Sequence, residues 1–536
     1  MHNLLIEYIY LILIILVLVM LAQRLKISYP IVLVLGGLVL SFTSPFSHIT
    51  IDPEVIFFVF LPPLLYEAAW EVSWKEFWKW RRVIMSLAFP IVVITSCVVA
   101  FVSNALIPGF TIALGFLLGG IVSPPDAISA TTIMKNVSVP RSLVSIAEGE
   151  SLLNDASSLI IFRFAIIAIT TGHFVVIEAV GDFFWVIIVG TLVGLGVGLV
   201  FYAIHRWLPT TPSMDTILSF VSPYCMYYFA ESFHVSGVIA VVSGGLFLSS
   251  QRQRLLTHLS RIQGTNFWST VGFVLNGMVF LLIGLQLPNI VEQLEDISLS
   301  MAITYGLFIT GVLIVTRLLC TLGTSIFTTF ASRYISVADA RPGFKAPIVL
   351  GWAGMRGVVS LAMALSIPVY TSDGDPFPQR NLILFITFLV ILVTLVFQGL
   401  TLPWIIRLMK LEEKGIPLPQ QEAIILRKMA TASLNFLEEN YADRVNKNDQ
   451  LKIMKARLQN EFKFFSQEGV ENLNPDNNQM TEYQLVNLRM LEVQRNLLYK
   501  MNKKSEYDEE LIRKYLALID LEETRVREKL PEGYHT

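Results

Sequence analysis

At residues 119–129 the chain reads Gly-Gly-Ile-Val-Ser-Pro124-Pro125-Asp126-Ala-Ile-Ser, in the middle of an apolar run that extends over 110–133. About 20 mostly apolar residues are enough to cross a membrane as a helix. Two consecutive prolines remove two amide donors and break the helical hydrogen-bond ladder. The carbonyls freed there must be satisfied inside the membrane, and lining a cation site is one way to do so. This stretch therefore predicts an interrupted transmembrane helix with Asp126 at the break.

A second apolar run, over 345–369, is interrupted in a similar way, because Gly351, Gly354 and Gly357 surround Arg356. If spans 1–6 and 8–13 of the chain are inverted repeats, each break falls in the fifth span of its repeat. Paired Gly/Pro-interrupted spans in corresponding positions point to a transporter site near the membrane midplane. We predict that Arg356 in one break offsets negative charge near the other.

The composition divides the chain into two parts. Of its 536 residues 54% are hydrophobic and 15% are charged, whereas soluble domains carry about 25% charged residues. We predict a transmembrane domain over 1–410, embedded in the lipid bilayer, and a cytosolic helical tail over 411–536. The net charge of −2 and the lack of any basic arm or nucleic-acid motif give no sign of a nucleic-acid partner.

The tail contains helix-forming runs and an Asn/Pro-rich break near Asn472–Asn478. Four amphipathic helices are predicted, over Glu422–Tyr441, Asp449–Phe465, Tyr483–Lys500 and Asp508–Lys529. A regulatory or dimer-stabilising role for this tail competes with the simpler interpretation that it is a solvated helical appendage.

The hydropathy pattern predicts thirteen spans: 4–22, 28–47, 53–70, 83–107, 110–133, 144–171, 175–204, 217–231, 235–250, 267–287, 299–329, 345–369 and 382–408. With the N-terminus outside, fifteen basic residues fall in the inside loops: Arg24, Lys26, Lys75, Lys79, Arg81, Arg82, Lys135, Arg141, Arg206, Arg252, Arg254, Arg261, Arg333, Arg341 and Lys345. The outside loops hold only Arg380. Positive charge is concentrated in cytoplasmic loops of membrane proteins, so we expect a multi-pass protein of the cell membrane with its tail in the cytosol.

The span over 144–171 carries a polar face. At 100° per residue, five of its polar side chains fall within an arc of about 140°, namely Glu150, Ser151, Asn154, Asp155 and Ser158. Such a face must point into the protein or into a water-filled cavity, because lipid does not accept it. A buried polar network that only ties helices together is the competing interpretation.

Other ionisable residues inside the apolar runs include Glu67, Arg163 and Arg317. Charged groups inside a bilayer are costly and usually have a partner or a function. Arg317 is a candidate counter-ion for Glu150.

These side chains suggest an exchange mechanism. Asp155, Asp126, Ser151 and freed carbonyls of the span over 110–133 can supply oxygen ligands to a bare monovalent cation such as Na⁺. Burial and a neighbouring carboxylate both favour the neutral form of a carboxyl group, so a proton and a cation compete for the same site. Competition combined with alternating access gives exchange, and the sequence holds no Walker A, zinc-site or dinucleotide motif that would indicate an enzyme or a bound cofactor.

The sequence resembles the monovalent cation:proton antiporters, specifically the sodium/proton exchanger branch, over most of 1–410. The string Glu148-Gly-Glu-Ser-Leu-Leu-Asn-Asp-Ala156 is similar to the most specific motif of the family. Phe60-Leu-Pro-Pro-Leu-Leu-Tyr-Glu67, Gly351-Trp-Ala-Gly-Met-Arg-Gly-Val-Val-Ser360 and the weaker Asn276-Gly277 and Gln398-Gly399 pairs resemble others. The pair Asn154-Asp155 resembles the electroneutral branch.

The resemblance implies thirteen helices with two discontinuous crossing helices, a mobile core and a homodimer. It implies that Asp155 is the central ion- and proton-binding carboxylate and that Asp126, Ser151 and Glu67 contribute to the Na⁺ site. It also implies that Asn154 steadies the dyad, that Glu150 pairs with Arg317, and that Arg356 lies in the crossing region. Transport of Na⁺ and H⁺ with a role in pH homeostasis follows as an expectation.

One position departs from the family pattern. Pro124-Pro125-Asp126-Ala127 stands where the family usually has Pro-Thr-Asp-Pro. The threonine hydroxyl is therefore absent, although the backbone carbonyl of Pro125 can still be a ligand. The choice among Na⁺, K⁺ and Li⁺ stays open, as does a cation uniporter or channel on the same fold. A remote alternative is an intramembrane aspartyl protease, for which only Gly181-Asp182 supplies part of a motif.

Overall fold

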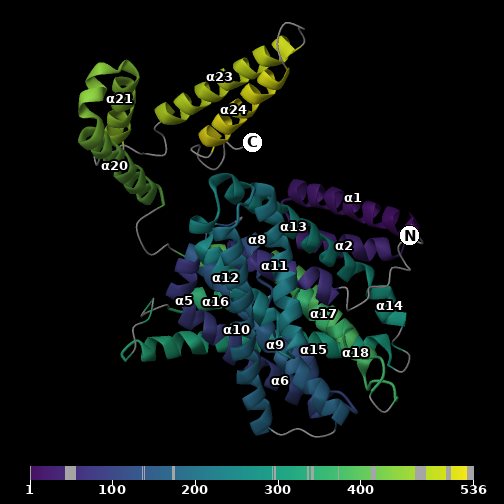
Figure 1. Cartoon of the computed structure of the whole chain (residues 1–536). Coiled ribbons are helices and arrows are strands. Elements are labelled where there is room, and N and C mark those ends of the chain that lie inside the picture. Colours follow the sequence, from purple (N-terminus) through teal and green to yellow (C-terminus); the bar gives the residue numbers. More distant parts are fainter. Residues whose placement is uncertain are drawn as a thin grey trace. The chain divides into compact units, whose positions relative to one another are not determined.

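The computed structural model describes residues 2–42, 56–135, 137, 139–171, 176–292, 294, 297–334, 337, 339, 343–371, 374–411, 418–464, 478–502 and 509–527. Within these ranges every named element is a helix (Figure 1). The chain divides into two compact units, Met1–Glu413 and Lys414–Thr536.

Eight α-helices and two π-helices, η1 and η2, are described in the first 171 residues. Their bounds are α1 His2–Leu25, α2 Tyr29–Ser41, η1 Ile56–Phe60, α4 Leu61–Glu71, α5 Trp74–Ser86, η2 Leu87–Ile91, α6 Val92–Leu106, α7 Ile112–Val122, α8 Ala127–Lys135 and α9 Arg141–Thr171. Pro90 lies inside η2, where its missing N–H makes the wider π-helical turn acceptable.

The rest of the first unit is also helical. Its elements are α10 Val176–Trp207, α11 Pro212–Ser232, α12 Gly237–Leu255, α13 His258–Leu285, α14 Leu287–Glu292, α15 Leu299–Ala331, α16 Lys345–Trp352, α17 Val358–Leu365, α18 Arg380–Val393, η3 Thr394–Gln398 and α19 Gly399–Met409.

Seven helical stretches in the described residues are long and apolar enough to cross a membrane: Trp74–Leu106, Ile112–Lys135, Arg141–Thr171, Gly181–Trp207, His258–Glu292, Leu299–Ala331 and Arg380–Met409. Two further predicted spans correspond to the shorter apolar stretches Ile9–Leu25 of α1 and Tyr29–Ser41 of α2. Others correspond to α4, α11, α12 and the α16–α17 pair. The number thirteen therefore stays a prediction. Several predicted features lie outside the described residues, including positions 43–47 and 53–55, Arg341, and Asn472–Asn477 of the tail break.

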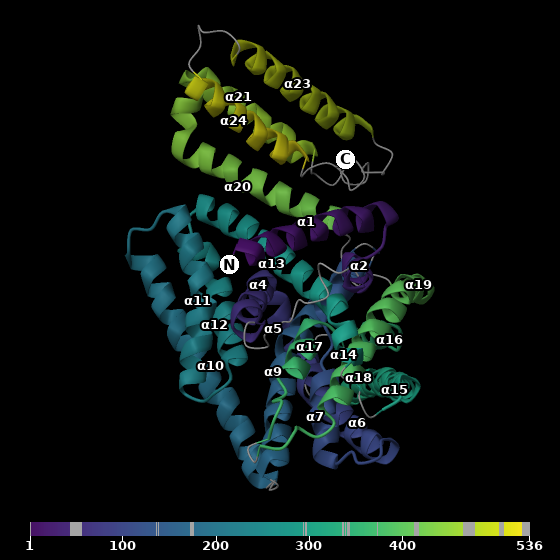
Figure 2. The same ribbon diagram turned by 90° about the vertical axis from the view of Figure 1, so that its right-hand side faces the viewer.

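Two groups of helices surround the site. Helices α10, α11 and α12 pack side by side, and α2 packs along α13 with α1 beside both (Figure 2). Helices α6, α7 and α9 form a second group against which α15, α17 and α18 pack. Small residues let α7 approach α6 closely, because a Cβ on Gly119 would lie 2.6 Å from the carbonyl oxygen of Ser96. Close backbone contact of this kind drives helix association in membranes.

The second unit consists of two helical hairpins. Helix α20 (Leu418–Lys447) packs on α21 (Asp449–Phe464), and α23 (Asn478–Asn502) packs on α24 (Glu509–Arg527). A small apolar cluster of Leu491, Ile519 and Val526 joins α23 to α24. The four helices overlap the four ranges predicted from the sequence.

Candidate functional site

The break between α7 and α8 is formed by Pro124 and Pro125, and Arg356 compensates it. Its Nε donates to the Val122 carbonyl at 2.7 Å and its Nη2 to the Ser123 carbonyl at 3.3 Å. These carbonyls end α7, and their helical donors, the amides of Asp126 and Ala127, donate instead to the Met355 carbonyl and the Ser151 hydroxyl. The guanidinium is fully buried, and a cation is favourable at the negative end of a helix dipole.

The second break, between α16 and α17, meets the first one directly. The Asp126 amide donates to the Met355 carbonyl at 2.6 Å, and the Arg356 amide donates to Thr394 at 3.2 Å. Glycine is needed at this crossing, since a Cβ on Gly357 would lie 2.6 Å from the carboxyl carbon of Asp126. The two interrupted helices are therefore pinned to each other at the site.

Asp126 caps the N-terminus of α8. Its Oδ1 accepts from the Ile128 amide at 3.1 Å, and its Oδ2 accepts from the Ser129 hydroxyl at 3.0 Å and the Ser129 amide at 3.4 Å. A carboxylate at a helix N-terminus satisfies free amides and interacts favourably with the dipole. Three donors hold this carboxylate in one orientation and leave fewer lone pairs for an ion.

Helix α9 presents its polar face to this crossing. The Asn154 amide Nδ2 donates to the Pro125 carbonyl at 2.9 Å, and the Ser151 hydroxyl accepts from the Ala127 amide at 3.2 Å. The carboxylate of Asp155, on the same face next to Ser151, accepts no hydrogen bond from any described residue. Asp155 therefore differs from Asp126, because its oxygens remain open to a ligand.

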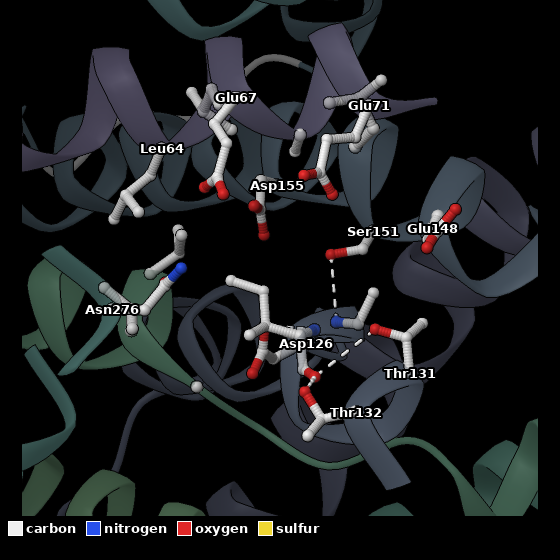
Figure 3. Close-up of a pocket in the computed structure, with 18 of the residues that line it drawn as sticks. Leu64, Glu67, Glu71, Asp126, Thr131, Thr132, Glu148, Ser151, Asp155 and Asn276 are labelled. Atoms are coloured by element: carbon white, nitrogen blue, oxygen red, sulfur yellow. Dashed lines mark hydrogen bonds between the residues drawn. The ribbon is translucent and has the colours of Figure 1, made fainter. Parts of the chain in front are cut away.

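A cavity of about 270 Å³ lies in front of these groups. Pro125, Asp126, Ser151, Asp155 and Glu67 all line it. Figure 3 shows Glu67 and Glu71 on α4 reaching in from one side and Asp126 from the opposite side, with Asp155 between them. A site with carboxylates on two sides and hydroxyls nearby supplies oxygen ligands for a hard monovalent cation.

Glu150 and Arg317 form an ion pair away from this cavity. Nη1 of Arg317 lies 2.8 Å from Oε1 of Glu150, and Nη2 donates to Oε2 at 3.0 Å. Their side chains are 4% and 2% exposed. With Pro125 and Asp126 they line a small void of about 10 Å³. Glu150 and Arg317 do not line the main cavity, and neither do Asn154 and Arg356.

Sequence reasoning gave no role in the site to several residues that line the cavity, although Glu148 and Asn276 belong to motifs and Lys135 to a predicted inside loop. The cavity mouth carries Glu71 and an ion pair between Lys135 and Glu148 at 3.2 Å. Asn276 of α13 also lines the cavity. At the far end of α9, Arg163 pairs with Glu231 of α11 at 2.8 Å. The sequence singled out Arg163 as an intramembrane charge but offered no signal for its partner, which lies 68 residues away.

An all-helical membrane protein whose two interrupted helices cross beside buried carboxylates belongs to the class of secondary transporters. Residues 11–408 match the family model described as "Sodium/hydrogen exchanger, transmembrane". The chain belongs to the sodium/hydrogen exchanger family, which confirms the family predicted from the motifs.

Similar proteins agree with this assignment. An uncharacterized Na⁺/H⁺ exchanger of Mycobacterium tuberculosis is 30% identical, with 94% of this chain and 93% of the relative aligned. A sodium, potassium, lithium and rubidium/H⁺ antiporter of Bacillus pumilus is 34% identical over 70% of this chain and 57% of the relative. The Na⁺/H⁺ antiporter NhaH of Halobacillus aidingensis is 30% identical over 76% of this chain and 98% of the relative.

The sodium proton antiporter MjNhaP1 of Methanocaldococcus jannaschii has a similar structure. The TM-score is 0.62 at 17% sequence identity, over 76% of this chain and 100% of the other. This likeness concerns the fold alone, and it confirms the predicted class of all-helical membrane antiporter folds.

Proposed function

We propose that this chain is a secondary active antiporter that exchanges Na⁺ for H⁺ by alternating access, with Asp155 as the carboxylate that binds each ion in turn. The observation that carries this proposal is the cavity in which Asp155 lies between Glu67 and Asp126 with no hydrogen-bond donor of its own among the described residues. A buried carboxylate with free oxygens binds either a proton or a metal cation.

The remaining oxygens around the cation come from neighbouring groups. Asp126 and the Ser151 hydroxyl line the same cavity, and the Pro125 carbonyl keeps one lone pair after accepting from Asn154. Glu67 contributes from the opposite wall, directly or through water. Na⁺ is then held at Asp126, Ser151 and Asp155, and it leaves when Asp155 takes up a proton.

The charges around Asp155 support electroneutral exchange. The residue before it is the neutral Asn154, and Glu150 is compensated by Arg317. One carboxylate therefore changes its occupant in each cycle, and it carries either one proton or one monovalent cation. Each turnover moves one positive charge in each direction.

The cavity mouth supports an inward-facing state. Glu71, Lys135 and Glu148 line it, and the loop-charge pattern assigns this end of the spans to the cytosol. We place the N-terminus outside the cell membrane, the transmembrane domain over 1–410 and the tail over 411–536 in the cytosol. Homodimer formation, pH homeostasis and a regulatory role of the tail belong to the same proposal.

The preferred cation is a separate question. The Bacillus pumilus relative is named for Na⁺, K⁺, Li⁺ and Rb⁺, and Pro125 removes the hydroxyl that a threonine would provide. Both observations support tolerance for cations other than Na⁺, so K⁺/H⁺ exchange is an outcome that the test must separate.

The test reconstitutes the protein in proteoliposomes and follows the internal pH after addition of Na⁺, K⁺ or Li⁺. Wild type should dissipate a pH gradient on Na⁺ addition, and Asp155→Asn should abolish this exchange. Asp182→Asn is the control, because Asp182 is exposed on α10 and does not line the cavity. Exchange by Asp155→Asn at the wild-type rate refutes the role of Asp155, and cation flux without proton flux would indicate a uniporter or channel.

A further inference from the structure

One face of α13 forms a wall of the cavity. Ser269, Phe273 and Asn276 all line it, and their spacing of four and three residues places them on one side of a helix. The wall belongs to α13, which is neither one of the interrupted helices nor α9. The ion site proposed above takes no ligand from it.

Asn276 is the polar residue at the deep end of this wall. It is 5% exposed, and its Oδ1 has no hydrogen-bond partner among the described residues. Figure 3 shows its amide pointing into the space that Asp155 and Asp126 share. A buried acceptor without a donor loses the free energy of a hydrogen bond. Unlike Thr387, which also has no partner among the described residues, Asn276 lines the cavity, so a cation inside it can compensate this loss.

Asn154 shows what a purely structural amide does in this protein. Its Nδ2 donates to the Pro125 carbonyl and joins two helices. Asn276 makes no such link to a described residue, although α2, α11 and α17 all pack against its helix. Its amide is therefore available to the contents of the cavity.

We propose that the Asn276 side-chain oxygen is a ligand of the transported cation on the α13 side of the cavity. A turn about the last side-chain bond brings Oδ1 to the position that the amide nitrogen occupies now. An amide oxygen coordinates a hard monovalent cation but takes up no proton at the pH values of the cell. Asn276 therefore raises affinity for the cation without affecting the proton, a division that a carboxylate cannot provide.

This inference rests on the proposed antiport function and assigns a cation-selective ligand within it. If a proton and a cation compete for Asp155, the half-saturating Na⁺ concentration is constant at alkaline pH. It rises below the pH at which Asp155 becomes protonated. A ligand that binds only the cation changes the constant half-saturating Na⁺ concentration at alkaline pH, the alkaline plateau. It leaves unchanged the pH below which this concentration begins to rise.

The experiment measures half-saturating Na⁺ against pH in proteoliposomes for wild type, Asn276→Leu and Asn276→Asp. Leucine has a similar size and no oxygen, so we expect its alkaline plateau to rise about tenfold, as for loss of one contact to a charged group. Aspartate restores an oxygen and should return the plateau to the wild-type value or below. Thr387→Val is the matched control, because Thr387 is also buried without a partner among the described residues but does not line the cavity.

Three results would overturn the inference. They are an unchanged plateau in Asn276→Leu, an equal rise in Thr387→Val, and a plateau in Asn276→Asp as high as in Asn276→Leu. If the leucine variant fails to fold, the aspartate variant still decides, since a plateau well above wild type contradicts an oxygen ligand. Failure of the antiport function itself is distinguishable, because wild type would then show no Na⁺-driven change of internal pH.

Discussion

The ion pair between Glu150 and Arg317 gives the sharpest energetic prediction. Both ends of the guanidinium fork meet the carboxylate, at 2.8 and 3.0 Å, and both side chains are buried. With an effective dielectric constant of about 20, two unit charges at 2.8 Å attract by about 6 kcal/mol. Most of this is offset by the cost of taking both charges out of water, but removing only one partner leaves the other buried and costs about 3–5 kcal/mol.

The prediction is therefore one of coupling. Arg317→Ala and Glu150→Ala should each destabilise the protein by about 3–5 kcal/mol, and the double variant should lose less than the sum of the two. We expect a coupling energy of about 1–3 kcal/mol, the upper range for residues in direct contact. Reversible unfolding in mixed micelles with increasing denaturing detergent measures each corner of the cycle.

Additive effects of the two substitutions would refute the pairing as an energetic unit. Transport provides a second readout, because Arg317 also donates to the Leu350 carbonyl at 3.4 Å in α16 and so joins Glu150 of α9 to the second interrupted helix. Arg317→Lys keeps the charge but loses the two-pronged contact. It should retain more stability than Arg317→Ala while still transporting more slowly than wild type.

Two further predictions concern the contact between α13 and Glu67 and the tail. A Cβ on Gly272 would lie 1.8 Å from the Glu67 carboxylate, so Gly272→Ala has to displace Glu67 and should raise the half-saturating Na⁺ concentration in the proteoliposome assay. A Cβ on Gly264 of the same helix would meet nothing within 4 Å, so Gly264→Ala should leave this concentration unchanged. In the tail, hydrogen bonds from Arg495 and Arg527 lower the pKa of Glu523. The α23–α24 hairpin should thus keep this stabilisation above the unfolded-state value of about 4.3 and lose it as pH falls through the lower folded value. Hydrogen exchange of the full chain should show this loss, and Glu523→Gln should remove it.

The sequence predicted the breaks because their cause is local. Consecutive prolines cannot form a helical ladder in any context. The last carbonyls of α7 then require a donor, and Arg356 supplies one to Val122 from 234 residues away. The pairing of Glu150 with Arg317 was also accessible, since two buried charges of opposite sign need each other. Residue types alone were thus enough to predict these features, because a buried charge or an unpaired backbone group has few ways to be satisfied.

Other parts of the site depend on which helices become neighbours. Asn276 lies in a mostly apolar helix, and only the packing of α13 against α2 and α17 turns its face toward the cavity. The hydrogen bonds of Asp126 to Ser129 are local, yet their consequence is visible only beside Asp155, which has no donor of this kind. The sequence shows both aspartates. It does not show that Asp126 already accepts three hydrogen bonds while Asp155 accepts none from a described residue.

The pair between Arg163 and Glu231 leads to a prediction about alternating access. Arg163 follows Asp155 by eight residues in α9, about 12 Å along the helix, in the direction away from the cavity mouth. Glu231 ends α11 and also accepts from the Gly237 amide at the start of α12 at 3.3 Å. The ion pair therefore fastens α9 to the α11–α12 group on the side away from the cavity mouth. This side has to open if Asp155 is to reach the outside.

Breaking this pair should favour the outward-facing state. Its side chains are 38% and 31% exposed, and such partly exposed pairs contribute about 0–1 kcal/mol. We therefore expect Glu231→Gln to change the ratio of outside to inside half-saturating Na⁺ by up to about fivefold, in favour of outside binding. Membrane vesicles of the two orientations measure both values, and exchanging the charges in Arg163→Glu with Glu231→Arg should restore the ratio.

The ion pair at the opposite end of α9 provides the decisive comparison. Lys135 and Glu148 join α8 to α9 at the cavity mouth, with side chains 57% and 27% exposed. Glu148→Gln removes a similar charge contact at the end that is already open. If the pairs act through alternating access, only Glu231→Gln shifts the ratio toward outside binding. Equal shifts in both variants would instead show a general effect of surface charge on Na⁺ concentration, and the role of Arg163 in closing the outer side would be refuted.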